Sequence, residues 1–329
     1  MSKLSAYTKA FFNHENYHGW FKKKKFFEGW YFKMVSADGN HAFAIIPGVA
    51  MDAKGNKQSF IQILDGKKFT AVYHKFLYEE FHPSAKRFKV SIGENSFSMN
   101  RLKLNLKEMK GKISFTEHAE WEKKLLAPGI MGWYSFVPFM ECYHQVVSMH
   151  FNLLGRIIID GQEVNFNGGR GYLEKDWGRS FPSSWIWMQS NHFGKDKTSF
   201  KLSVAKIPWI GTSFVGFICA FLQDGKIQKF ATYTGAKLKH IEIEKNHVSV
   251  TLEDKKFILN VYATRPPGAE LVSPILGLMD GRVHESMVSE ITVQLREKQS
   301  GKTIFEDVGK HAGIEVAGNI NELLEGYKK

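Results

Sequence analysis

Short strand-like runs separated by turn signals recur along most of this chain, and they constrain its fold more than any other feature. The clearest runs lie at residues 26–35, 41–47, 59–64, 69–74, 87–92, 102–106, 112–119, 144–152, 156–159, 163–167, 256–262 and 286–296. Asp-Gly pairs such as Asp38-Gly39 and Asp65-Gly66 lie between some of them, and this pair is a typical hairpin turn. The pattern predicts an all-β meander, sandwich or barrel.

Composition and length support this interpretation. The chain contains 27 phenylalanines but only nine prolines, and aromatic residues make up 14 % of it. Aromatic side chains pack well on a pleated surface. A length of 329 residues is large for a single hydrophobic core, which favours two domains.

A weak internal repeat indicates where the two domains meet. Trp30-Tyr31-Phe32 is followed by a turn, an apolar strand and then Asp65-Gly66. Trp185-Ile186-Trp187 is followed by the same elements in the same order, ending at Asp224-Gly225. We therefore predict two related β-domains in tandem, at residues 1–179 and 180–329.

Three further segments have patterns of their own. Residues 2–12 predict a short amphipathic helix or an arm, and residues 265–279, which include Pro266, Pro267 and Pro274, predict a loop. The tail predicts a last strand at 313–316 followed by a short helical end.

The charge is strongly basic, at a formal +12 from 45 basic and 33 acidic residues. The densest basic run is Lys22 to Lys25, and no nucleic-acid-binding signature accompanies it. The pattern therefore predicts no nucleic-acid partner, and leaves open a solvated surface or a peripheral contact with an anionic membrane.

The first twelve residues lack a signal core, and Cys142 and Cys219 form no disulfide framework. We expect a cytoplasmic protein.

Several familiar catalytic signatures are absent from the sequence. It has no phosphate-binding P-loop, no dinucleotide fingerprint, no nucleophile elbow and no His-Glu-x-x-His helix. Its 13 histidines form no group with metal-ligand spacing. We therefore expect no cofactor and no metal, and chemistry other than nucleotide-dependent or serine-hydrolase reactions.

The most unusual stretch is 169–193, which carries three of the eight tryptophans together with two carboxylates. If residues 170–177 are extended, Tyr172, Glu174 and Asp176 share one face of the strand. The two carboxylates then lie about 7 Å apart, close enough for each to raise the pKa of the other in a dry site. This pair is a candidate general acid. The alternative is a structural pairing with nearby arginines.

Glu28 is a third candidate acid because aromatic residues flank it on both sides, at Phe26-Phe27 and Trp30-Tyr31-Phe32. Burial there would raise its pKa, whereas a salt bridge with a lysine is the structural alternative. Trp177, Trp185 and Trp187 are either core residues or an aromatic wall that stabilises a cation. His192, which follows Asn191, is either a proton donor or a structural histidine.

Three motifs resemble those of the tocopherol cyclase family. They are Phe26-Phe27-Glu28-Gly29-Trp30-Tyr31-Phe32-Lys33, then Gly171-Tyr172-x-Glu174-Lys175-x-Trp177-Gly178-x-Ser180-Phe181-Pro182-x-x-Trp185-x-Trp187-x-Gln189-x-Asn191-x-Phe193, and Gly313-Ile314-Glu315-Val316-x-Gly318. The family is related to carotenoid hydratase-like and Diels–Alderase-like proteins. The resemblance implies two lipocalin-like β-domains, of barrel or sandwich type, with an apolar cavity.

The resemblance also implies an activity, the cofactor-independent, acid-catalysed cyclisation of a prenylated quinol or related isoprenoid. Glu174, Asp176 or Glu28 would supply the proton. The substrate would contact Trp30, Tyr172, Trp177, Trp185, Trp187, Asn191 and His192. Asp176 stands where photosynthetic members carry asparagine, so another prenyl quinol or terpenoid stays open as substrate. A non-catalytic carrier or sensor of a hydrophobic ligand, and a hydratase acting on the same substrates, are the alternatives.

Overall fold

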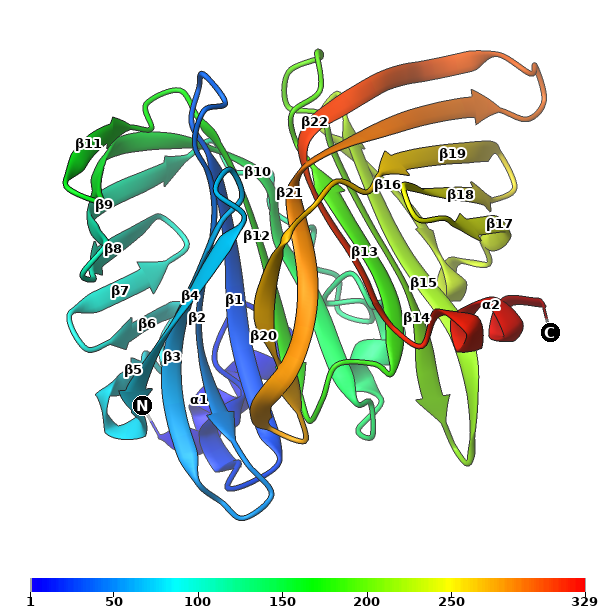
Figure 1. Ribbon diagram of the computed structural model, residues 1–329. Coiled ribbons are helices and arrows are strands. Elements are labelled where there is room, and N and C mark those ends of the chain that lie inside the picture. The colour runs from blue at the N-terminus through cyan, green and yellow to red at the C-terminus, as the bar shows by residue number, and fades with distance from the viewer. Residues whose placement is uncertain (1, 329) are drawn as a thin grey trace. The chain divides into compact units, whose positions relative to one another are not determined.

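A computed structural model describes residues 2–328, and most of these residues are in β-strands (Figure 1). The helices among these residues are α1 (Lys3–Phe12), η1 (Gly19–Phe21), η2 (Tyr78–Glu80), η3 (Gly132–Phe136), η4 (Thr232–Thr234) and α2 (Ile320–Lys328). None of the helices in this described range is long and apolar enough to cross a lipid bilayer. The all-β fold class is confirmed. Met1 and Lys329, the outer ends of the predicted domains, lie outside the described residues.

The first sheet has twelve antiparallel strands. They are β1 (Phe26–Val35), β2 (Ala42–Met51), β3 (Lys57–Asp65), β4 (Thr70–Leu77), β5 (Phe81–Pro83), β6 (Lys89–Ile92), β7 (Asn95–Ser98), β8 (Arg101–Asn105), β9 (Met109–Thr116), β10 (Cys142–Ile159), β11 (Gln162–Asn165) and β12 (Arg170–Gly178). The strand order is β4-β3-β2-β1-β12-β10-β9-β8-β7-β6-β5, and β11 pairs with β10 beside this path. β4 and β5 are the two end strands of this order.

The second sheet has ten strands. They are β13 (Ser184–Ser190), β14 (Ser199–Trp209), β15 (Thr212–Gln223), β16 (Lys226–Ala231), β17 (Lys237–Ile243), β18 (His247–Glu253), β19 (Phe257–Thr264), β20 (Ala269–Ile275), β21 (Leu278–Glu297) and β22 (Thr303–Gly318). The order is β16-β15-β14-β13-β22-β21-β19-β18-β17, with β20 paired to β21.

Both sheets follow the same route, which confirms the internal repeat. In each sheet four consecutive strands pair in sequence, and the first of them also pairs with the last strand of the sheet. Trp30 lies on β1, and Trp185 and Trp187 lie on the equivalent strand β13. The Asp-Gly turns at 65–66 and 224–225 follow β3 and β15, which are also equivalent.

The chain divides into two compact units. The first comprises the residues up to Asp65 together with Thr70–Phe181 and Leu271–Arg282, and the second comprises the remainder. The first unit therefore includes a short segment distant in sequence, where the Gln62 side chain binds the backbone of Val272 through both its amide atoms, at 2.8 and 3.3 Å. Independent folding of two domains divided between residues 179 and 180 stays a prediction.

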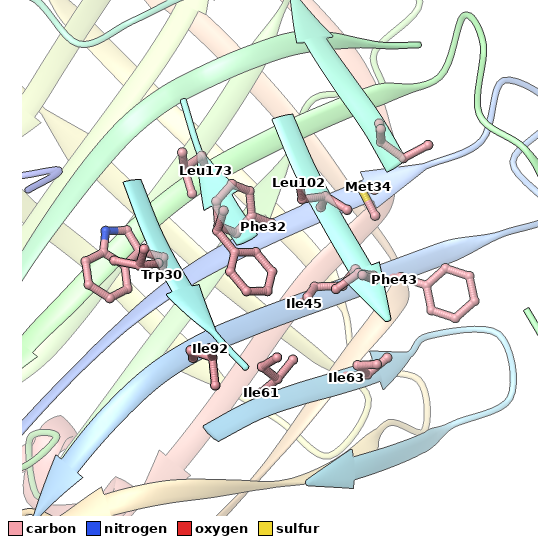
Figure 2. Packing of buried hydrophobic residues seen from close by; sticks show 14 of the residues in the cluster. Trp30, Phe32, Met34, Phe43, Ile45, Ile61, Ile63, Ile92, Leu102 and Leu173 are labelled. Atoms are coloured by element: carbon pink, nitrogen blue, oxygen red, sulfur yellow. The ribbon is translucent and has the colours of Figure 1, made fainter. Parts of the chain in front are cut away.

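The core of the first unit contains aromatic residues at alternate positions of its strands. Trp30, Phe32 and Met34 alternate along β1 and point to the same side of the sheet (Figure 2). Phe32 is fully buried, and its ring centroid lies 5.9 Å from those of Phe97 and Phe115. Because strand period places every second residue on this side, aromatic residues at alternate positions build one continuous core.

A polar turn sets the register between β1 and β2. The carboxylate of Asp38 accepts hydrogen bonds from the Ser36 hydroxyl and the Asn40 backbone N–H, at 2.5 and 3.0 Å. Gly39 has φ = 70°, which an L-residue adopts only with strain. Val35 therefore pairs with Ala42, and the aromatic residues of β1 face the core.

Two sequence predictions differ from the structure. Residues 265–279 contain the strand β20 and the start of β21, so the predicted loop is wrong there. Among the described strands β20 pairs with β21 alone, and an edge strand tolerates Pro274 because a ladder N–H is not needed. The predicted strands 144–152 and 156–159 are one strand, β10, which continues through Gly155 at φ = 135°.

Phe32→Ala tests the core of the first unit. We expect the free energy of unfolding to fall by about 3–5 kcal/mol, because truncation removes the ring and leaves a cavity. Chemical unfolding followed by circular dichroism measures the change. Val72→Ala on the half-exposed β4 is the matched control and should shift the same quantity by less than about 0.5 kcal/mol. Equal effects of the two substitutions would contradict the placement of Phe32 in the core.

Candidate active site

Strand β12 divides its side chains between the two faces of the first sheet. Leu173 and Trp177 belong to the hydrophobic core of the first unit, and Lys175 lies on the same face. Tyr172, Glu174 and Asp176 occupy the opposite face, where the Tyr172 hydroxyl donates a hydrogen bond to Glu174 Oε2 at 2.6 Å. The alternation predicted from the sequence is therefore correct.

A histidine from the neighbouring strand β10 joins the two carboxylates. His144 pairs in register with Asp176, and its Nδ1 lies 2.9 Å from Asp176 Oδ1. Its Nε2 lies 3.5 Å from Glu174 Oε2. We call His144, Tyr172, Glu174 and Asp176 the acid cluster.

Burial differs across the acid cluster. Tyr172 is fully buried, whereas the side chains of Glu174, His144 and Asp176 are 5 %, 13 % and 23 % exposed. Asp176 is therefore the more accessible carboxylate. Burial, reinforced by the neighbouring Glu174, raises the pKa of Tyr172 well above its usual value, so this phenol keeps its proton and acts as a hydrogen-bond donor.

A thiol also lies beside the acid cluster. The Sγ of Cys142 lies 3.8 Å from Asp176 Oδ1. Burial, together with the negative charge of Asp176, raises the pKa of Cys142 well above its usual value. The thiol is thus protonated at neutral pH and is not an activated nucleophile.

The acid cluster also contains a donor set that could hold a divalent cation. One ligand atom from each of His144, Glu174 and Asp176 lies within 4.8 Å of the other two. Imidazole and carboxylate donors suit several divalent ions. The sequence did not predict this grouping because His144 comes from another strand, and the absence of a metal stays a prediction.

Glu28 and Lys175 form a buried ion pair on the opposite, core face. Lys175 Nζ lies 2.5 Å from Glu28 Oε1, and both side chains are fully buried. Glu28 also accepts hydrogen bonds from the backbone N–H groups of His18, at 3.0 Å, and Gly19, at 3.2 Å. Lys175 donates to the backbone carbonyls of His14, at 2.8 Å, and Asn16. The pair therefore fastens residues 14–19 to the sheet.

Aromatic rings surround this ion pair. The Nζ of Lys175 lies 4.8 Å from the ring centroids of both Trp30 and Trp177. Trp177 also stacks on the ring of His18 at 4.2 Å. Burial lowers the pKa of Lys175 to about 8, against the opposing effect of Glu28, and burial raises the pKa of Glu28. The salt bridge that the sequence offered as the alternative for Glu28 is present.

A pocket of about 370 Å³ lies in the first unit. Phe88, Phe97 and Val147 contribute apolar surface to it, and Arg101 and Lys123 are among its charged residues. Glu28, Glu174 and Asp176 are not among the described residues that line it. This pocket therefore does not bring a predicted acid into contact with a ligand.

The remaining predicted residues belong to the second unit. Trp185 and Trp187 alternate on β13 with the core residues Ile186 and Met188, so they lie on the face opposite that core. The Trp185 indole donates to Glu315 Oε2 at 2.7 Å. Asn191 is buried, and the carbonyl of His192 accepts the Lys310 backbone N–H at 3.0 Å.

The structure thus sorts the predicted site residues into three groups. Tyr172, Glu174 and Asp176 lie together, and Glu28, Trp30 and Trp177 surround Lys175 on the other face of the same sheet. Trp185, Trp187, Asn191 and His192 lie on or just after β13. The substrate-binding roles predicted for these residues stay predictions.

Sequence reasoning missed His144 and Lys175 as members of these groups. The signal for His144 was available in part, because the period of β10 places it on one face with Cys142 and Val146. Its partner could be named only with the register between β10 and β12, which contains two irregularities.

Lys175→Met tests the buried ion pair. We expect the free energy of unfolding to fall by about 3–5 kcal/mol, because Glu28 is left buried without its partner. Adding Glu28→Gln should restore part of this loss. Lys195→Met, which breaks the exposed pair with Asp224, is the control and should cost less than about 1 kcal/mol. Chemical unfolding measures all four proteins, and a Lys175→Met protein as stable as the wild type would contradict the assignment.

Comparison with known proteins places these features in a family. The family model described as tocopherol cyclase-like matches residues 107–318, a range that includes β10, β12 and β13. The opening motif at 26–33 lies outside it.

Two curated relatives come from plants. The rice protein (Oryza sativa subsp. japonica) named probable tocopherol cyclase, chloroplastic is 28 % identical over 198 residues, covering 57 % of this chain and 42 % of the relative. The maize protein (Zea mays) named tocopherol cyclase, chloroplastic is 26 % identical over 198 residues, covering 57 % and 41 %. The chain thus spans about two fifths of the length of these relatives.

Among solved structures, that of CghA with Sch210972 is similar in fold. The TM-score is 0.51 at 11 % identity, and the match covers 89 % of each chain. Because the family model matches well over half of the chain, this protein belongs to the tocopherol cyclase-like family.

Proposed function

We propose that this protein catalyses the acid-dependent cyclisation of a prenylated quinol or a related isoprenoid, with the acid cluster as its proton-transfer group. The observation that carries the proposal is the position of His144 between Asp176, at 2.9 Å, and Glu174, at 3.5 Å. Membership of the family and the names of the plant relatives support the substrate class.

The cluster divides the proton-transfer roles between its members. Asp176 is the more exposed carboxylate, so it is the member that faces the substrate alkene. Glu174 accepts the Tyr172 hydroxyl and lies 3.5 Å from His144 Nε2, so it is the second proton acceptor beside the imidazole. The imidazole can carry a proton between the two carboxylates, because each of its nitrogens lies beside one of them.

The proposed reaction is redox-neutral and conserves every atom. A proton from Asp176 adds to one carbon of a trisubstituted alkene and leaves a tertiary cation on the other. The quinol oxygen attacks this cation, and a C–O bond closes the ring. The proton lost from that oxygen returns to the cluster through His144 or Glu174, so the cluster ends in its starting state.

Glu28 is a weaker candidate for the acid on structural grounds. It is fully buried, paired with Lys175 and bonded to two backbone N–H groups, and it lies on the other face of the sheet. The cytoplasmic location and the binding roles of the tryptophans stay predictions beside this proposal.

Asp176→Asn and Glu174→Gln test the roles in the cluster. We expect Asp176→Asn to lower turnover by about 10²-fold or more, because the amide cannot donate the proton. Photosynthetic members carry asparagine at this position, so their proton comes from another group and the role of Asp176 is specific to this chain. Glu174→Gln should lower it less, because His144 can still return the proton to Asp176. Glu163→Gln, which changes an exposed carboxylate of β11, is the control. Liquid chromatography measures turnover of a phytyl hydroquinone, and circular dichroism checks the fold. Full activity in both cluster variants would contradict the assignment.

The reaction in heavy water identifies the chemistry. A cyclase should convert the phytyl hydroquinone into a product with one carbon-bound deuterium and no other change in composition, because the acid cluster exchanges with solvent. A hydratase would add one molecule of water to the substrate. A carrier would return the ligand unaltered. Mass spectrometry separates these results, and either of the last two would overturn the proposal.

A further inference from the structure

Helix α1 exposes its larger apolar residues instead of burying them. Ala6 and Ala10 are its buried side chains, whereas Leu4, Tyr7 and Phe11 are 66 %, 40 % and 39 % exposed. The spacing of these three residues places them on one stripe of the helix. A helix that packs through alanines and leaves so much of Leu4, Tyr7 and Phe11 exposed presents an apolar stripe to solvent.

Two other segments of the first unit extend this stripe. The ring of Tyr7 contacts that of Phe21, at 5.6 Å between centroids, and the ring of Phe11 contacts that of Phe136, at 5.4 Å. Phe21 is 52 % exposed. The Lys123 ammonium donates to the Asn13 side chain at the end of α1, at 3.2 Å, so the segment that carries Leu125 and Leu126 starts beside the helix. These two leucines are 76 % and 77 % exposed. We call Leu4, Tyr7, Phe11, Phe21, Leu125 and Leu126 the apolar patch.

Basic residues flank the apolar patch. Residues 2–25 contain six lysines and one acidic residue, and Lys22, Lys23, Lys24 and Lys25 are all exposed directly after Phe21. The acidic residue, Glu15, is already neutralised by Lys123 at 2.7 Å. The surface beside the patch is therefore positively charged.

We propose that the apolar patch docks this protein on the surface of an anionic lipid bilayer. Exposed apolar side chains on a helix and on loops enter the boundary between headgroups and acyl chains, and lysines beside them bind anionic headgroups. We favour a bilayer over a protein partner because of the four exposed lysines at the edge of the patch. Each lysine near an anionic bilayer adds to the binding free energy. The proposal stands on surface chemistry alone and does not depend on the proposed cyclase activity.

Vesicle sedimentation of the full chain tests the proposal. The vesicles contain phosphatidylcholine alone, or phosphatidylcholine mixed with phosphatidylglycerol. Leu125→Ser with Leu126→Ser removes the most exposed part of the patch, and Ile210→Ser, at a residue 75 % exposed in the second unit, is its control. Lys23→Glu with Lys24→Glu reverses charge, and Lys255→Glu with Lys256→Glu, two exposed lysines, is the control for charge.

We expect the wild type and both controls to bind the mixed vesicles more tightly than the neutral ones, and salt to weaken this binding. Each patch variant should lose more than about tenfold in partition onto mixed vesicles. Wild-type protein that binds neither vesicle overturns the proposal, and so do patch variants that bind as their controls do. A patch that instead mediates self-association, detected as a dimer lost in the leucine variant without any vesicle binding, overturns it as well.

Discussion

The antiparallel pairing of β1 with β12 is the constraint on which both groups of charged residues depend. Its register places Glu28 beside Trp177 and Trp30 beside Lys175 on the core face, and Tyr31 beside Glu174 on the other. A slip of one residue would exchange the two faces. The core face would then receive the acid cluster, and Lys175 would lose the carboxylate that neutralises it. One ladder thus keeps two sets of ionisable groups chemically separate.

The Glu28–Lys175 ion pair on the core face holds residues 14–19 in place more than it adds to the free energy of unfolding. Removing two charges from water carries a large desolvation cost, which a buried pair seldom recovers in full. Here the pair binds four backbone groups, from His14, Asn16, His18 and Gly19, and two indole rings flank the ammonium group. These contacts fix the chain between α1 and β1, and so set where the helix presents its outward stripe.

The strand period in the sequence predicted which residues share a face of one strand. Which residues of different strands lie side by side depends on strand pairing, which the sequence did not reveal. The alternation of Tyr172, Glu174 and Asp176 needed only the strand period. His144 could not be assigned to them, because its register on β12 includes bulges that sequence does not reveal. The loop predicted at 265–279 was wrong because strand pairing is again not visible in the sequence. Proline is compatible with a strand that lies at the edge of a sheet, as β20 does. The repeat was readable because its tryptophans and Asp-Gly turns are local signals.

The same ladder has a consequence for biosynthesis. Residues of β1 find their partners on β12 only after the intervening strands have left the ribosome, since Phe27 pairs with Gly178. Such a high contact order slows folding, and until closure the nascent chain carries Phe26, Trp30 and Phe32 on an incomplete sheet. Exposed strands of this kind are prone to aggregation, so the interval before β12 emerges is when this polypeptide most needs a chaperone.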